Sequence, residues 1–137
     1  MAFKMNANAK DYLINQGIIN QIAGTSGTSG TATLNIYSGT QPTNADTGTN
    51  GTLLCTVGNI GWNTATAGSS ALTGTNSGTA SIAGTAGWAR MTTVNTNGTF
   101  CMDGEIGTAG TSTFIINNTV IVASDVVKLL SANISIP

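Results

Sequence analysis

From residue 33 onward the sequence is a succession of short segments with strand-like alternation, separated by runs of glycine, asparagine and threonine. In TLNIYS (33–38), for example, Leu34 and Ile36 fall on one face of an extended chain and the polar residues fall on the other. Short alternating segments bounded by turn formers are typical of antiparallel strands. Because helices do not alternate with these strands, a parallel α/β sheet is not expected. The pattern predicts an all-β protein with an antiparallel β-sandwich or jelly-roll-like body.

The same alternation places the individual strands. A hairpin is expected where GWARMTTV (87–94) and TFCMDGEIG (99–107) flank the turn sequence NTNG. A long loop of turn-forming residues, 39–51, separates the first two strands. The last segment could begin as a helix, but its end, SANISI, alternates as a strand. We expect strands over residues 33–38, 52–57, 58–66, 79–84, 87–94, 99–107, 112–118, 119–123 and 126–137, with a weak fragment at 71–72.

One helix is expected near the N-terminus, over residues 8–23. Its apolar residues recur with helical spacing, which predicts that one face is buried. The stripe consists of Ile14, Ile18 and Ile22 at i, i+4 and i+8, with Leu13 and Ile19 beside them.

The flanking residues carry signals for both ends of this helix. Asn6 or Asn8 can cap the start, and Asp11 is expected in the first turn, where a negative charge is favoured. Gly24 can close the end in a left-handed conformation. Gly17, in the middle, lowers helix stability by up to about 1 kcal/mol relative to alanine. The helix is therefore expected to be stable only when it is docked.

Two interpretations of the helix stay open. It can pack on its own domain, or it can dock on a neighbouring subunit together with the arm Met1–Ala7. We expect a single domain overall, made of an N-terminal arm and helix (1–24) and a β-sandwich body (25–137). Deleting Met1–Ile22 is expected to leave the β-body folded and to abolish its attachment to a partner.

The chain carries very little charge. Charged residues make up 7% of it, histidine is absent and the formal net charge is −1. The four lysines and arginines are too few for a phosphate-binding footprint, so nucleic acid is not an expected partner. Because proton transfer and metal binding mostly use clustered His, Asp, Glu, Cys and Lys, we expect no enzyme, no cofactor and no metal site. A weakly charged surface suits a protein that is packed against neighbours.

Neither a membrane span nor a secretory signal is expected. There is no run of about 20 apolar residues, and the N-terminal residues lack the continuous apolar core of a signal peptide. Synthesis in a cytoplasm is therefore expected. In that compartment Cys55 and Cys101 are most simply small buried side chains, and a disulfide between them stays open as the alternative.

Few residues offer candidate chemistry. Asp103 and Glu105 are the only closely spaced acids, and on a strand they would share a face that suits paired carboxylates or a hard cation. If the DG step forms a turn instead, both face water, and this is the simpler interpretation. Arg90 is expected to pair with one of them across the hairpin, with an acidic partner surface as the alternative. The large aromatic residues are expected in the core, with stacking on sugars or bases as the alternative: Tyr37, Trp62, Trp88 and Phe100.

A family resemblance adds to this reading. LNIYSGTQPTNAD (34–46), followed by GTLLCTV, resembles small virion proteins of tailed bacteriophages, in which a helical N-terminus precedes a strand, an IYSGTQP-type loop and a TLLA-like strand. Later, TASIAGTAGWARMTT (79–93) resembles the family's aTGTAtWFRl strand and FCMDGEIGT (100–108) its vfDGsVGT hairpin. The ending STFIINNTVIVASDVVKLLSANISIP resembles lnLnttsIvaGatVsvtsftit. The match covers most of residues 8–137 and departs from the family at the cysteine pair and at a polar insertion, 63–78.

The resemblance implies a cement or decoration protein that binds the major capsid protein on the surface of a phage head and is made in the cytoplasm of the host bacterium. A homo-oligomer, dimer or trimer, would multiply weak contacts at a symmetry axis. The N-terminal arm with the helix and the loop Gly39–Gly51 are the expected contact elements. The candidate capsid or subunit contacts are Phe3, Lys4, Met5, Tyr12, Ile14, Ile18, Ile22, Thr40, Gln41, Pro42 and Asp46.

Other functions stay open beside this one. The chain could serve elsewhere in the virion, in the tail, neck or fibres, and such a module could bind a host glycan through clustered aromatics. An enzyme would need two carboxylates across a cleft, for which Asp103 and Glu105 are the candidates.

Overall fold

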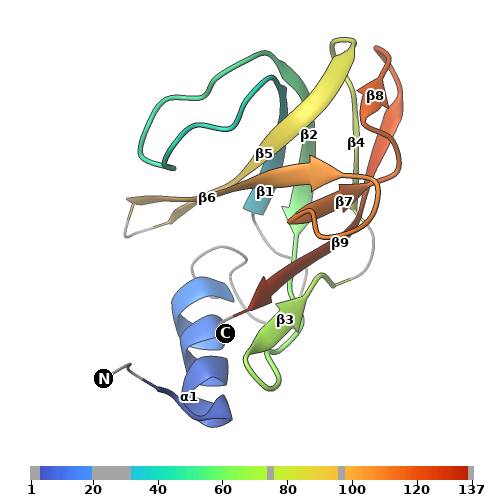
Figure 1. The fold of residues 1–137 in the computed structure, drawn as a ribbon. Coiled ribbons are helices and arrows are strands. Elements are labelled where there is room, and N and C mark those ends of the chain that lie inside the picture. The colour runs from blue at the N-terminus through green and yellow to red at the C-terminus, as the bar shows by residue number, and fades with distance from the viewer. Residues whose placement is uncertain (1–3, 20–31, 74–75, 96–97, 136–137) are drawn as a thin grey trace.

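A single curled β-sheet with one N-terminal helix forms the fold (Figure 1). The computed structural model describes residues 4–19, 32–73, 76–95 and 98–135. A short α-helix runs directly into a π-helical turn, and nine strands follow. The elements are α1 (Ala7–Tyr12), η1 (Leu13–Ile19), β1 (Ala32–Ser38), β2 (Leu53–Ile60), β3 (Ser69–Ala71), β4 (Asn76–Thr79), β5 (Gly84–Asn95), β6 (Gly98–Gly107), β7 (Phe114–Ile116), β8 (Val120–Ile121) and β9 (Val126–Ser135).

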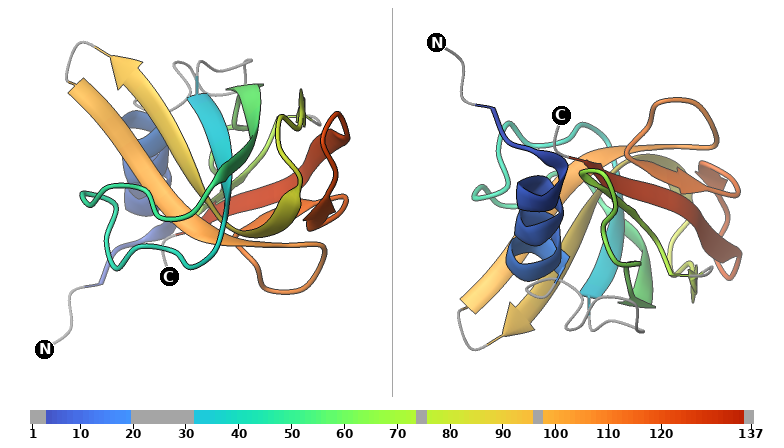
Figure 2. Two further views of the ribbon diagram at one scale, coloured as in Figure 1. Left: turned by 90° about the horizontal axis from the view of Figure 1, so that it is seen from above. Right: turned by 90° about the horizontal axis from the view of Figure 1, so that it is seen from below.

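The strands pair in the order β2-β1-β5-β6-β7-β9-β3, with β4 added to β9 and β8 added to β5. All of these pairs are antiparallel except β6 with β7, which run parallel. The sheet curls into a half-barrel, which brings β4 back beside β2 (Figure 2). A bridge between Cys55 and Ala80 joins these two ends of the sheet. The predicted all-β, sandwich-like class with one N-terminal helix is confirmed.

The inner, concave face of the sheet holds the core. In β1 the buried residues alternate as predicted, with Leu34 and Ile36 fully buried. Ala89 and Met91 of β5 lie on the same inner face, beside Leu34 and Ile36 in the register. Burial of these aliphatic side chains is the main stabilising contribution to the body, at roughly 25 cal/mol per Å² of apolar surface.

The observed strands differ from the predicted ones in several places. The expected strand 58–66 was wrong: residues 58–60 belong to β2, and beyond them only isolated bridges form, at Trp62 and Thr66. Residues 80–83 do not continue β4 and form an irregular stretch instead. This stretch is joined to the loop before β9 by backbone hydrogen bonds of Ala80 with Ser124 and Asp125. The segment from Val126 is a strand from its first residue and does not begin as a helix. It is held extended because β4 pairs with one edge of β9 and β7 with the other, so tertiary pairing overrides local helix propensity.

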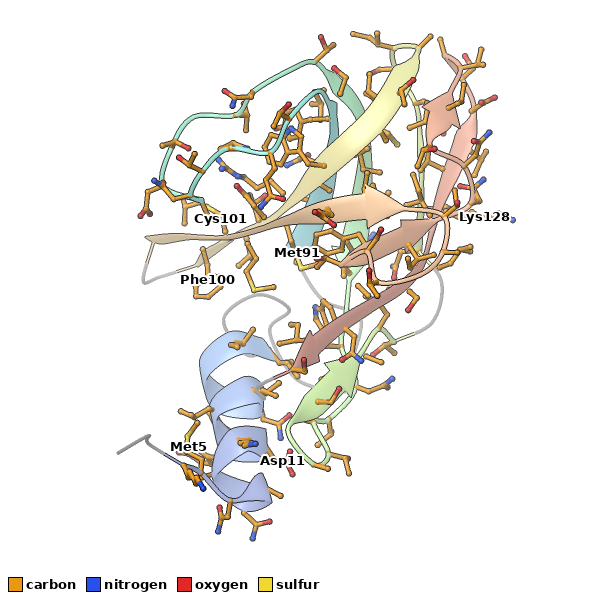
Figure 3. All side chains as sticks on the ribbon, viewed as in Figure 1. Met5, Asp11, Met91, Phe100, Cys101 and Lys128 are labelled. Atoms are coloured by element: carbon orange, nitrogen blue, oxygen red, sulfur yellow. The ribbon has the colours of Figure 1, made fainter. Side chains whose placement is uncertain are left out.

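The predicted helix is observed from Ala7 to Ile19, and its expected continuation to residue 23 and the Gly24 cap lie outside the described residues. Asn6 is the N-cap, since its side chain accepts a hydrogen bond from the Ala9 N–H at 2.9 Å. The expectation for Asp11 was wrong: the first turn contains no acidic residue. Asp11 lies a turn later and points at the turn before β3 (Figure 3).

The helix packs on its own chain, as the first of the two interpretations predicted. Ala67 and Gly68 both have left-handed backbone angles, which turn their two successive N–H groups toward the Asp11 carboxylate. Asn15 accepts a further hydrogen bond from the Ala65 N–H at 2.8 Å. Ile14 and Ile19 are fully buried in the core beneath these polar contacts. The helix is thus an integral part of the folded body.

Candidate binding surface

The loop that joins β1 to β2, residues 39–52, folds back over the outer face of the sheet (Figure 1). This is the loop of the IYSGTQP motif. The outer face below it is built by residues that oppose one another in the register of β1, β5 and β6: Tyr37 faces Trp88, and Arg90 faces Asp103. The loop therefore covers a part of the outer sheet face that carries large polar and aromatic side chains.

A nearly buried ion pair lies at the centre of this arrangement. The Arg90 Nε and Nη2 atoms donate to the two carboxylate oxygens of Asp103, at 2.6 and 2.7 Å. The two side chains are only 9% and 4% exposed. Hydrogen bonding to Asp103 raises the pKa of Arg90 above its ordinary value, so the guanidinium stays charged. The predicted cross-hairpin pair of Arg90 is confirmed, with Asp103 as the partner.

Arg90 also holds the loop. Its Nη1 atom donates to the backbone carbonyl of Thr47 at 3.0 Å. Because Asp103 engages the opposite side of the guanidinium, the arginine is fixed in the one orientation that reaches this carbonyl. The ion pair therefore joins three elements: β5, β6 and the middle of the loop.

Trp88 makes a second attachment. Its Nε1 atom donates to the Asn50 carbonyl at 3.2 Å. The indole stacks on Tyr37 with ring centroids 4.7 Å apart and an interplanar angle of 14°. The Arg90 guanidinium lies over the same indole, 5.6 Å from its centroid, a favourable cation–π distance. We call the four residues Tyr37, Trp88, Arg90 and Asp103 the loop clamp.

The base of the loop is closed by the backbone. The Ser38 N–H donates to the Thr52 carbonyl, and the Thr52 N–H donates to the Ser38 hydroxyl, both at 3.0 Å. Gly51 has φ +83°, and a Cβ atom there would collide with the Ser38 carbonyl oxygen. Only glycine allows the chain to return this closely alongside β1.

This closure gives a testable prediction. Gly51→Ala should lower the free energy of unfolding by about 1–3 kcal/mol, because it combines a strained backbone angle with a backbone collision. Gly48→Ala, in the same loop, is the matched control, since no atom lies near its added Cβ and its φ is not left-handed. Urea denaturation followed by tryptophan fluorescence measures both. Equal midpoints for the two variants would contradict this account of the loop base.

The outer side of the loop presents small polar groups. Asn44 organises its tip, because its side-chain oxygen accepts from the N–H groups of Asp46 and Thr47, both at 3.0 Å. Of the predicted contacts, Thr40 and Asp46 are exposed, Gln41 is half-buried and Pro42 is buried. The exposed part of the loop is thus polar, nearly uncharged and held in one conformation by the clamp behind it.

The predicted contacts near the N-terminus are divided between the two sides of the helix. Tyr12 is 67% exposed and Lys4 is exposed, whereas Ile14 is fully buried and does not reach the surface. Met5 and Ile18 are half-buried, and Ile18 packs against the core. Phe3 and Ile22 lie outside the described residues.

The other candidate residues take structural positions. Trp62 is buried in the core and Phe100 packs against it, as predicted. Trp88 is also buried, but beneath the loop and outside the core cluster. The expectation of a core position was wrong for Tyr37, which is half-buried and stacks on Trp88. The DG step is part of β6 and not a turn, so Asp103 and Glu105 do lie on the same strand. However, Asp103 is neutralised by Arg90, whereas Glu105 is exposed opposite Trp88.

The two cysteines are free, and they lie on strands separated by β1 and β5. Cys55 is buried in the core, and this burial raises the pKa of its thiol. Cys101 is half-buried on the loop side of β6, opposite to the side on which Phe100 lies (Figure 3). Their separation in the sheet explains why the cysteines do not pair.

A hollow of about 410 Å³ lies between the loop before β7 and the end of β9. Its lining consists of hydroxyl, amide and small aliphatic groups from residues such as Thr113, Ser131 and Asn133 and contains no ionisable side chain.

No helix within the described ranges is long and apolar enough to cross a membrane. Comparison of the chain with protein-family models, with curated proteins and with solved structures found no match.

Sequence reasoning identified the side chains of the loop clamp but not their role. It predicted the Arg90 pairing and placed the aromatic residues in the core. It did not predict that Arg90 and Trp88 hold the loop, because their acceptors at Thr47 and Asn50 are backbone carbonyls. Every residue has such a carbonyl, so no sequence signal marks these two.

Proposed function

We propose that the chain is a bacteriophage capsid decoration protein, which binds the lattice of the major capsid protein on the virion surface and stabilises the head. The loop 39–52 is the proposed capsid-binding element. The protein adds buried surface between neighbouring capsid subunits, and its stabilising effect is that of a ligand bound only to the assembled lattice. No catalytic step is part of this function.

One observation carries the proposal. Three segments that carry the family resemblance meet at the loop clamp: Tyr37 comes from the first, Trp88 and Arg90 from the second, and Asp103 from the third. These segments lie far apart in the sequence, yet all serve to hold one loop in one conformation. Holding a loop rigid before binding lowers the entropy cost of ordering it on a partner. This arrangement suits a loop whose task is binding.

The chemistry of the loop indicates the kind of surface that it would meet. Its exposed side chains are hydroxyls and amides with a single charge, Asp46. A contact of this kind depends on shape and hydrogen bonds and only weakly on ionic strength. It suits a permanent position on an uncharged part of a protein lattice.

The first experiment is a measurement of copy number. Quantitative mass spectrometry of purified virions, relative to the major capsid protein, should give hundreds of copies in a simple ratio to the capsid subunit. A few tens of copies would place the protein in the tail, neck or fibres instead. Absence from the particle would overturn a virion role altogether.

A binding experiment then tests the loop. The double variant Thr40→Ala, Gln41→Ala should lose most of its occupancy on heads that lack the protein, while its unfolding midpoint stays unchanged. Thr111→Ala, in an exposed loop elsewhere, is the matched control and should bind as the wild type does. Equal occupancy of the double variant and the control would contradict the assignment of the loop as the binding element.

A further inference from the structure

The outward face of the N-terminal helix is unusual for a surface helix. Its inner face is buried in the core, so the outer face would ordinarily carry charged residues. Instead, the exposed residues between Asn8 and Gly17 are uncharged, and they include Tyr12 and Leu13, at 67% and 45% exposure. Small residues, Ala9 and Gly17, lie next to these two and leave room for a partner to approach. We call Ala9, Tyr12, Leu13, Gln16 and Gly17 the helix face.

A second exposed apolar surface lies at the opposite end of the molecule. Ile82, Val120, Val122 and Val126 are each between 48% and 60% exposed. The segments that carry these residues are held together by backbone hydrogen bonds. Ala80 bonds with residues 124 and 125, and β8 pairs with the start of β5. We call these four aliphatic residues the apolar tip. Figures 1 and 2 place β8, at the tip, and the helix on opposite sides in every view.

The apolar tip also contains a hollow. A cavity of about 250 Å³ lies between β8 and the start of β9, with Val120, Val126 and Asp125 in its lining. It has room for a protruding side chain, and Tyr12 on the helix face protrudes from the other end of the molecule. The lining of the hollow combines valine and isoleucine side chains with Asn117, Asn118 and Asp125. A tyrosine, with its apolar ring and polar hydroxyl, suits such a mixed lining.

The charges beside the two surfaces are opposite in sign. Lys10, three residues before Leu13, flanks the helix face, and Lys4 is exposed nearby; Asp11 is already bound to the turn before β3. Asp125 is exposed at the apolar tip, where one of its carboxylate oxygens accepts a hydrogen bond from the Val122 N–H at 3.0 Å. Lys128 projects from the side of β9 (Figure 3). Contacts between two tips or between two helix faces would bring like charges together. A helix face against a tip pairs Lys10 with Asp125.

From these observations we propose that the protein associates head-to-tail, the helix face of one copy docking on the apolar tip of the next. Because the two surfaces lie on opposite sides of one molecule, this contact joins only different copies, and its repetition gives a closed ring or an open chain. We expect this association to be weak in free solution and to increase with protein concentration. This inference does not depend on capsid binding.

Cysteine cross-linking tests the contact directly. In a Cys101→Ser background, which leaves buried Cys55 as the only other thiol, one preparation carries Leu13→Cys and another carries Val122→Cys. Mild oxidation should give cross-linked dimers in the mixture and not in either preparation alone. Cross-linking within the Val122→Cys preparation alone would indicate tip-to-tip contact and overturn the proposal, as would the absence of cross-links in the mixture.

Sedimentation velocity of the full chain, from micromolar to millimolar concentration, measures the strength of self-association. Tyr12→Ser and Val122→Ser should each weaken association about tenfold or more, because each removes a central apolar contact. Leu130→Ser, exposed on β9 outside both surfaces, is the matched control and should associate as the wild type does. Lys10→Glu should weaken association and Lys10→Arg should preserve it. A chain that stays monomeric at millimolar concentration would overturn the proposal.

Discussion

Replacing Asp103 with alanine should lower the free energy of unfolding by about 3–5 kcal/mol, the effect of leaving one charge of a buried pair without its partner. The guanidinium of Arg90 would remain in a site that is only 9% exposed, with the Thr47 carbonyl as its one remaining acceptor among the bonds described above. Urea denaturation, followed by tryptophan fluorescence and far-ultraviolet circular dichroism, measures the change.

Glu105→Ala is the matched control for this variant. Glu105 is an acid two residues further along the same strand, but it is exposed and lies opposite Trp88. Its replacement should change the free energy of unfolding by no more than about 0.5 kcal/mol. Similar small effects for both variants would contradict the structural importance of the ion pair.

A double variant separates stability from loop order. Arg90→Met with Asp103→Leu replaces the pair by apolar side chains of similar size and should recover most of the lost stability. It leaves the Thr47 carbonyl without the donor that holds the loop. Limited proteolysis should therefore cut within residues 39–52 faster than in the wild type. Unchanged proteolysis would mean that Trp88 and the loop base hold the loop without Arg90.

Truncating the buried side of the helix should have an equally large effect. Ile14 and Ile19 are fully buried, and each replacement by alanine should destabilise the protein by about 2–5 kcal/mol. Together these losses approach the whole stability of a domain of this size, about 5–15 kcal/mol. The double variant should therefore be largely unfolded at room temperature and show no cooperative unfolding transition on heating. A chain that lacks residues 1–19 should behave in the same way.

The outer side of the same helix supplies the control. Tyr12→Ala and Leu13→Ala remove exposed side chains and should each change stability by less than about 1 kcal/mol. The expectation that the body folds without Met1–Ile22 is thus replaced, because the helix contributes to the core. A chain that lacks residues 1–19 and still unfolds at the midpoint of the wild type would contradict this conclusion.

The features predicted most accurately from the sequence are those that depend on the regular spacing of apolar residues. The antiparallel pairing of β5 with β6 and the pairing of Arg90 with Asp103 follow from period-two spacing. The helix was predicted for the same kind of reason, because its apolar residues recur with a fixed period. These features depend on residues that are close in the sequence, so their spacing alone constrains them.

The features that escaped prediction depend on distant backbone groups. The loop lies over Trp88 and Arg90 because those side chains reach backbone carbonyls at Asn50 and Thr47. Ala67 adopts φ +53° although it is not glycine, and this aims its N–H at Asp11. Alternation marks which face of a strand is buried, but not which loop will cover its other face.

The docking of the helix also bears on how the chain folds during synthesis. The residues that receive the helix lie 50 to 57 positions after its own contact residues. At about 5–20 residues per second, a ribosome would need roughly 3–10 s to add that stretch. Throughout that interval Ile14 and Ile19 have no core to enter. Because the strand partners are also distant in sequence, we expect refolding in milliseconds to seconds and early exposure of the helix to chaperones.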